Sequence, residues 1–227
     1  MELKVKKILI LVSGRGSNMS SIIKTCRAFE WPIEVLGVIA DKKCEATVNA
    51  EKMGVRNKVV NKEDYKPVEF QYRLSESIKE VNPDLIVLAG FMVILKEQFF
   101  HDLFHIMVNI HPSLLPKFPG LNTHKRALES KETVHGASVH SVRGPIDSGP
   151  IICQGKLNIR SNDNPESLGI RVLKIEHMIF PMAVGAVLSG KVRLVDDKWT
   201  ISNHLNDSWY KADFKESYDF SDCGFSS

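Results

Sequence analysis

The residues best suited to chemistry are Asn109 and His111, two positions apart at the end of an apolar segment, residues 106–110. In a β-strand, alternate residues share a face, so Val108 and Ile110 enter the core while Asn109 and His111 point together. An amide that donates a hydrogen bond, beside an imidazole that moves a proton, can stabilise the oxyanion of an acyl transfer. A lone histidine is more often structural, but this pair, before a rigid loop rich in proline, favours catalysis.

A carboxylate follows in the segment IDSGP, residues 146–150. Taken alone, Asp147 with a glycine two residues later is equally well explained as ordinary turn chemistry. Close to His111, however, it would orient the imidazole and accept protons through water. The sequence does not give the distance between them, so both interpretations stay open at this point.

A different pattern, SGRGSN at residues 13–18, is suited to an anion. It follows the first predicted strand and opens the first predicted helix, where backbone N–H groups favour a phosphate. The pattern is not GxGxxG, because Met19 stands where the last glycine would be, and no GK[ST] of a Walker loop follows. A turn that needs glycine and a capping side chain is the alternative, but the carboxyl end of a first strand is where open α/β sheets place ligands.

Other kinds of site are disfavoured. The remaining histidines show neither HExxH nor Cys/His ligand spacing, so we expect no metal. No serine sits in a GxSxG elbow and no cysteine lies next to an obvious base motif, which argues against covalent catalysis. Direct transfer between two bound substrates, one of them phosphorylated, is what remains.

The elements that must position these residues alternate along the chain. Uninterrupted apolar strands linked by helices predict an α/β fold, a Rossmann-like doubly wound and mostly parallel sheet flanked by helices. Asn122 or Thr123 is expected to cap the fifth helix, and Pro165 to start the last one. The predicted strands are residues 7–13, 33–40, 55–60, 84–89, 106–110, 134–142, 151–159 and 191–195, and the predicted helices 18–29, 45–53, 64–81, 94–104, 123–130 and 165–188.

Composition sets the remaining bounds. The 227 residues suit one large domain, which we place at residues 1–197, followed by a C-terminal extension, 198–227, that is surface-packed or disordered. A net charge of +3, from 30 basic and 27 acidic residues, is too balanced to indicate a nucleic-acid partner. The four cysteines lack CxxC spacing, and the apolar run at residues 8–12 is too short for a signal peptide or a membrane span. We therefore expect a cytoplasmic protein with neither nucleic-acid nor membrane partners.

Several long motifs resemble the phosphoribosylglycinamide formyltransferases of de novo purine (IMP) biosynthesis. They occur in matching order from about Lys7 to Val195: ILVSGRGSN, LAGFMVIL, VNIHPSLLPKFPGLNTHKRALES, HGASVHSV and IDSGPII. The resemblance implies the formyltransferase fold and transfer of a formyl group from 10-formyltetrahydrofolate, the co-substrate, to the amine of 5'-phosphoribosylglycinamide. No metal is implied, and the state is monomer or homodimer.

The resemblance also implies roles for residues at matching positions. The catalytic residues are Asn109, His111 and Asp147. The nucleotide is assigned to Arg15, Gly16, Ser17, Asn18, Lys174 and Glu176, and the folate to Met92, Val93, Ile94, Leu95, His140, Arg143, Gly144 and Asp147. Val93 stands where family members often have arginine, and no position securely matches the arginine that holds the folate glutamate tail.

Two alternatives of other classes are kept. A formyltetrahydrofolate hydrolase of the same fold would use water in place of the amine, but it would not need the SGRGSN segment. A binding module without catalysis would have no use for Asn109, His111 and Asp147. A formyl-transfer assay with and without the nucleotide separates these functions.

Overall fold

The computed structural model describes residues 4–103, 106–202 and 209–221. The chain forms two compact units, residues 1–109 and 110–227, and each is described by itself. Strand β5 (Met107–His111) carries the chain from the first unit into the second. Val108 and Ile110 of this strand are buried, as the alternation in the sequence predicts.

The first unit is built on a parallel sheet with the strand order β5-β4-β1-β2-β3. The central strand β1 is buried from Ile8 to Val12, which explains why its sequence is uninterruptedly apolar. The strands are β1 (Lys6–Val12), β2 (Ile33–Ala40), β3 (Asn57–Val59) and β4 (Leu85–Leu88).

The helices of the first unit form two packed pairs, α1 with α2 and α3 with α4. The chain steps outward from β1 to β3 and then returns to β4 on the other side of β1. Because such crossovers are right-handed, the two pairs cover opposite faces of the sheet. The helices are α1 (Ser17–Ala28), α2 (Glu45–Lys52), α3 (Pro67–Val81) and α4 (Glu97–Asp102), with a 3₁₀ turn at Lys62–Asp64.

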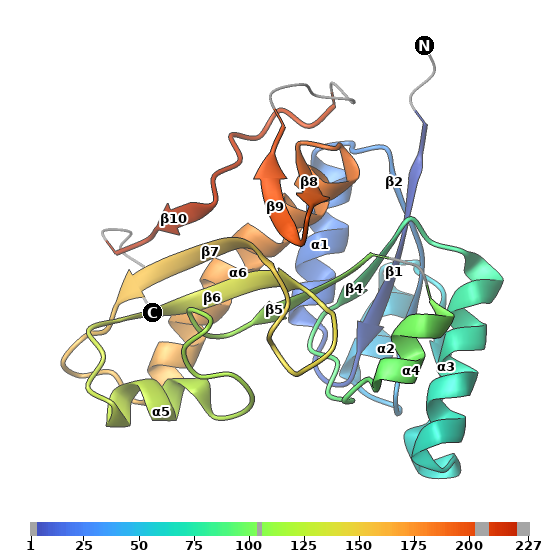
Figure 1. Ribbon diagram of the computed structural model, residues 1–227, viewed down its shortest axis with the longest axis horizontal. Helices are drawn as coiled ribbons and strands as arrows, with labels where there is room; N and C mark the ends of the chain where they lie inside the picture. Colours follow the sequence, from blue (N-terminus) through green and yellow to red (C-terminus); the bar gives the residue numbers. More distant parts are fainter. Residues whose placement is uncertain (1–3, 104–105, 203–208, 222–227) are drawn as a thin grey trace. The chain divides into compact units, whose positions relative to one another are not determined.

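The second unit pairs β6 (Val134–Ser141) with β7 (Ile151–Asn158) in antiparallel fashion, and the long helix α6 (Pro165–Leu188) packs on both (Figure 1). The short helix α5 (Thr123–Glu129) packs on α6. A hairpin of β8 (Val192–Val195) and β9 (Lys198–Ile201) follows α6, and β10 (Ser217–Asp219) runs parallel to β7. None of the helices described is long and apolar enough for a transmembrane segment.

Most predicted elements agree with the structure, and the differences have local causes. The helix predicted from residue 64 begins at Pro67, which occupies its first turn, after the separate 3₁₀ turn. The helix predicted at 94–104 begins at Glu97, and Phe104 lies outside the described residues. The predicted side-chain cap of α5 is wrong, because Asn122 adopts a left-handed conformation, with φ 58°, and makes no capping hydrogen bond.

The part of the chain after residue 197 is more ordered than a surface tail where the structure describes it. β9 pairs with β8, so the predicted limit after residue 197 falls in the turn of a hairpin. Tyr210, Phe214 and Phe220 are buried. The division into a domain at 1–197 and an extension stays a prediction.

Candidate active site

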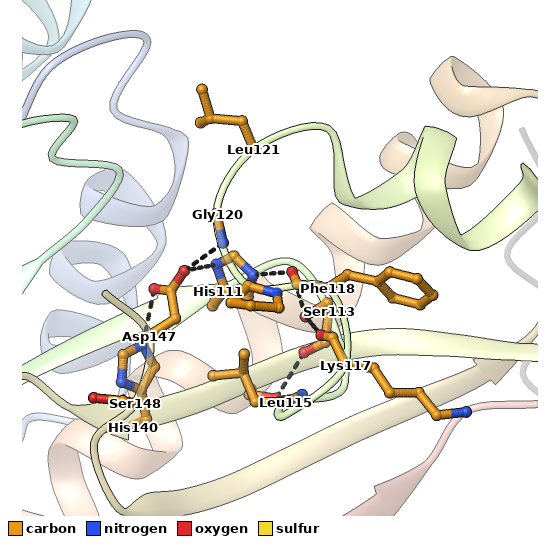
Figure 2. A network of polar contacts seen from close by, with 12 residues as sticks. His111, Ser113, Leu115, Lys117, Phe118, Gly120, Leu121, His140, Asp147 and Ser148 are labelled. Carbon is orange, nitrogen blue, oxygen red and sulfur yellow. Dashed lines mark hydrogen bonds and ion pairs between the residues drawn. The ribbon is translucent and has the colours of Figure 1, made fainter. Parts of the chain in front are cut away.

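His111 and Asp147 lie side by side in the second unit (Figure 2). His111 ends β5, and its Nδ1 is 3.2 Å from Asp147 Oδ2. The other ring nitrogen, Nε2, is 2.9 Å from the carbonyl oxygen of Phe118. Both side chains are nearly buried. Of the two interpretations of Asp147, the structure therefore favours the one in which the carboxylate orients the imidazole.

The loop after β5 is held in shape by its own hydrogen bonds. The Ser113 hydroxyl donates to the carbonyl of Lys117 (2.6 Å), and Ser138 on β6 donates to the carbonyl of Ser113 (2.6 Å). Phe118 and Gly120 both have positive φ, of 55° and 77°. This conformation aims the Phe118 carbonyl at His111 and the Gly120 N–H at Asp147.

Asp147 lies between two imidazoles. Its Oδ2 accepts a hydrogen bond from the Gly120 N–H (2.8 Å), and its Oδ1 is 3.6 Å from His140 Nε2. His140, at the end of β6, has its Nδ1 2.8 Å from the carbonyl of Ser141. The resemblance assigns His140 to folate, and its proximity to Asp147 was not predicted from the sequence. The signal was present in HGASVHSV, where strand alternation brings His140 to the end of β6 just before the IDSGP turn.

The pKa values of the pair are shifted in the same direction. Partial burial works against the charge of Asp147, but the nearby imidazole of His140, the hydrogen bond from the Gly120 N–H and the charge of His111 lower its pKa below the ordinary value. Burial lowers the pKa of His111, although the Phe118 carbonyl and Asp147 act in the opposite direction. At neutral pH the free protein therefore holds an ionised Asp147 beside a largely neutral His111.

In the first unit, the predicted anion loop depends on a glycine at residue 16. Gly16 has φ 75° and precedes α1, and a Cβ placed on it would lie 2.6 Å from the Cβ of Ala46. The Ala46 N–H donates to the carbonyl of Gly14 (2.9 Å), so the start of α2 packs directly on the loop. Arg15 is exposed, whereas Asn18 is nearly buried. Only glycine fits at residue 16.

The segment predicted to contact folate, Met92–Leu95, lies against the same loop. The Met92 N–H donates to Ser13 Oγ (2.8 Å), which joins the two segments. Gln71 on α3 fixes the far end, because its side-chain amide donates to the carbonyl of Ile94 (3.4 Å) and its oxygen accepts from the Lys96 N–H (2.9 Å). Gln71 was not predicted from the sequence, where its signal was a polar residue on the apolar face of a helix.

The remaining predicted residues lie in the second unit. Lys174 and Glu176 are on α6, the former half-buried and the latter buried. Arg143 and Gly144 are exposed in the loop after β6, where Arg143 forms an ion pair with Asp197. The structure thus brings together His111, Asp147 and His140, and separately the loop 13–18 with Met92–Leu95.

Within the ranges described, no group of three or more His, Cys, Asp or Glu side chains is arranged to hold a metal ion. The absence of a metal from the reaction stays a prediction.

Comparison with known proteins decides the family. The model of the Formyl transferase family matches residues 6–184. The phosphoribosylglycinamide formyltransferase of Escherichia coli is 34% identical over 209 residues, which cover 91% of this chain and 99% of that protein. A solved structure of the Coxiella burnetii phosphoribosylglycinamide formyltransferase superimposes with a TM-score of 0.85 at 34% identity, over 95% of this chain and 100% of that one. This chain belongs to the phosphoribosylglycinamide formyltransferase family.

Membership of the phosphoribosylglycinamide formyltransferase family confirms the resemblance and the fold class, a mostly parallel sheet flanked by helices. The chain also matches the trifunctional purine biosynthetic protein adenosine-3 of Bos taurus, at 39% identity over 193 residues. The match covers 84% of this chain but only 19% of the length of that longer protein.

Proposed function

We propose that this protein transfers a formyl group from 10-formyltetrahydrofolate to the amine of 5'-phosphoribosylglycinamide. The observation that carries the proposal is the contact of His111 with Asp147 in a chain of this family. His111 stands two residues after Asn109. A transferred formyl group passes through a tetrahedral intermediate that bears an oxyanion. Donors aimed at such an oxyanion are the largest single source of rate in acyl transfer.

The ligands are assigned to residues whose local setting supports a binding role. The loop 13–18 supports the phosphate, because Gly16 turns the backbone and, as the N-cap, offers no side chain to the first N–H groups of α1. Met92 and Ile94 are exposed while their backbone is fixed by Ser13 and Gln71, which suits a folate ring held by main-chain groups. The nucleotide is assigned to Arg15, Gly16, Ser17, Asn18, Lys174 and Glu176, and the folate to Met92, Val93, Ile94, Leu95, His140, Arg143, Gly144 and Asp147.

In the proposed mechanism, the substrate amine attacks the formyl carbon and forms a new C–N bond. Asn109 and the protonated form of His111 stabilise the oxyanion. Asp147 accepts from Nδ1 of His111, so the second N–H of the protonated ring, on Nε2, is available to the oxyanion in place of the Phe118 carbonyl. The proton lost by the amine passes through water and Asp147 to the departing folate nitrogen as its bond to carbon breaks.

The test uses purified protein, 10-formyltetrahydrofolate and 5'-phosphoribosylglycinamide, and follows the appearance of tetrahydrofolate. Turnover that requires the nucleotide supports the transferase. Turnover without the nucleotide would instead establish a hydrolase, and the absence of any turnover a binding module. A cytoplasmic location and a monomer or homodimer stay predictions.

A further inference from the structure

The β8–β9 hairpin touches the segment that carries Asp147 at two points. Trp199 on β9 donates its indole N–H to the hydroxyl of Ser141, at 2.8 Å. Asp197, in the turn of the hairpin, pairs with Arg143. Ser141 and Arg143 stand at the end of β6 and the start of the loop that contains Asp147. The hairpin is therefore joined to this loop by side-chain contacts.

Ser141 is a fixed point for both His140 and the loop. Its carbonyl is 2.8 Å from His140 Nδ1, and its N–H donates to the carbonyl of Pro150 (2.9 Å), which closes the loop. The loop also packs tightly there, because a Cβ on Gly149 would lie 1.9 Å from the carbonyl oxygen of Ser141. Ser141 is buried, so a change in its position is passed to the ring of His140 and to both ends of the loop.

The contacts then continue to the catalytic histidine. His140 Nε2 is 3.6 Å from Asp147 Oδ1, and Asp147 Oδ2 is 3.2 Å from His111 Nδ1. A continuous series of polar contacts thus runs from the indole of Trp199 to the imidazole of His111. Every member of the series belongs to the second unit.

We propose that Trp199 is a positioning residue for the reaction. Its indole N–H fixes Ser141, and Ser141 fixes the ring orientation of His140 and the placement of Asp147 against His111. This inference rests on the proposed function for its catalytic consequence. It assigns a role to a residue beyond 197, in the segment that the sequence predicts to be an extension.

Of the two contacts, the indole hydrogen bond is the stronger candidate. The side chains of Arg143 and Asp197 are 54% and 74% exposed, and exposed ion pairs contribute little because solvent screens them. The hydroxyl of Ser141 is buried, so loss of its donor leaves a polar group without its partner. We therefore attribute the positioning to Trp199.

The experiment compares Trp199→Phe with Thr200→Val, a matched change in the same hairpin. Phenylalanine keeps an aromatic ring and removes the indole N–H. Thr200 donates to the carbonyl of Arg193 (3.2 Å), a contact inside the hairpin, so its loss leaves Ser141 untouched. Ser141→Ala removes the same hydrogen bond from the acceptor side, and it serves if the tryptophan variant does not fold.

Kinetics, calorimetry and NMR are all measured at one pH. Because a net hydrogen bond is equivalent to about 0.5–1.5 kcal/mol, we expect Trp199→Phe to lower kcat about 2- to 12-fold. The KM for phosphoribosylglycinamide and the stoichiometry of its binding by calorimetry should not change. A full stoichiometry shows that the variant is folded, so the lower kcat then reports the misplacement of His140 and Asp147. In the free protein, the ring-nitrogen NMR signals of His140 should move in Trp199→Phe and Ser141→Ala but not in Thr200→Val. Joining Trp199→Phe to Ser141→Ala should add no further loss of kcat.

The outcomes separate the two claims. If the wild-type protein transfers no formyl group, the proposed function is wrong, and the NMR signals still decide whether Trp199 positions His140. If the wild type is active and Trp199→Phe matches Thr200→Val in kcat and in the His140 signals, the positioning role is wrong. A double variant whose losses multiply would also overturn it, because the two side chains would then act independently.

Discussion

The substitution Asp147→Asn tests the centre of the site with a minimal change of shape. The asparagine oxygen can still accept the hydrogen bond from the Gly120 N–H, at 2.8 Å in the native protein. The negative charge is lost, however, and with it the attraction for His111 at 3.2 Å and for His140 at 3.6 Å. The variant therefore removes charge from the site while it keeps the loop contact.

The expected magnitude follows mainly from the contact with His111, because 3.6 Å is too long for a hydrogen bond from His140. A hydrogen bond to a charged group contributes about 1.5–3 kcal/mol. At about 1.4 kcal/mol for each factor of ten, its loss lowers kcat/KM about 10- to 10²-fold. Loss of a general acid or base typically costs about 10²- to 10⁴-fold, so the fall is larger where Asp147 also moves the proton.

The assay is the formyl transfer from 10-formyltetrahydrofolate, measured as kcat/KM for the wild type and Asp147→Asn. Asp213→Asn is the matched control, because Asp213 is 84% exposed and pairs only with Lys215 among the ion pairs described. It should keep wild-type activity. The reasoning is refuted if Asp147→Asn folds like the wild type and keeps more than a tenth of its kcat/KM. A second readout is the pKa of His111, which should fall further, because Asp147 is one of the groups that raise it.

Three further predictions concern other parts of the molecule. Gly16→Ala should weaken the binding of phosphoribosylglycinamide at least tenfold, as measured by calorimetry. The new Cβ would lie 2.6 Å from the Cβ of Ala46, and the φ of 75° is strained for alanine. Unchanged affinity would exclude the loop 13–18 from binding. Burial lowers the pKa of His135 from 6.5 to about 4. Between these two pH values the unfolded chain binds more protons than the folded one, so the free energy of unfolding should fall as the pH falls from 6.5 to about 4. Urea titrations of wild type and His135→Gln measure this, and an equal pH dependence in both would contradict it. Phe220→Ala should cost about 3 kcal/mol of unfolding free energy in the same titrations, because its buried ring packs near Gly155, whereas a ring laid on the surface would give almost no change.

The strand and helix pattern was largely predictable because the buried strands are uninterruptedly apolar. β2 (Ile33–Ala40) and α6 (Pro165–Leu188) agree with their predicted limits to the residue. The starts of α3 and α4 were less predictable. A proline decides where α3 begins, and an extended segment decides where α4 begins. Local pattern therefore predicts the interior of an element better than its start.

The candidate site was predicted from residue types, but its contacts were not. Spacing and resemblance nominate Asn109, His111 and Asp147, which stay predictions, whereas only the fold places His140 between Asp147 and Ser141. Trp199 gave no signal at all, because its partner Ser141 lies 58 positions earlier in the chain. Gln71 showed only as a polar residue on the apolar face of a helix, and its partners Ile94 and Lys96 lie 23 and 25 positions later in the chain.

The surroundings of His111 are suited to a residue that changes its protonation during a reaction. Both ring nitrogens face acceptors, Nδ1 the carboxylate of Asp147 and Nε2 the carbonyl of Phe118. A neutral imidazole has only one N–H, so it satisfies one of these acceptors at a time. Burial lowers the pKa of His111 and withholds the second proton in the free protein, whereas Asp147 and the Phe118 carbonyl favour it. A negative charge that develops nearby, such as the oxyanion of the proposed tetrahedral intermediate, raises this pKa further. His111 would thus be protonated, with an N–H hydrogen-bond donor on each ring nitrogen, at the step that forms the oxyanion. It would return to the neutral form when that negative charge is gone.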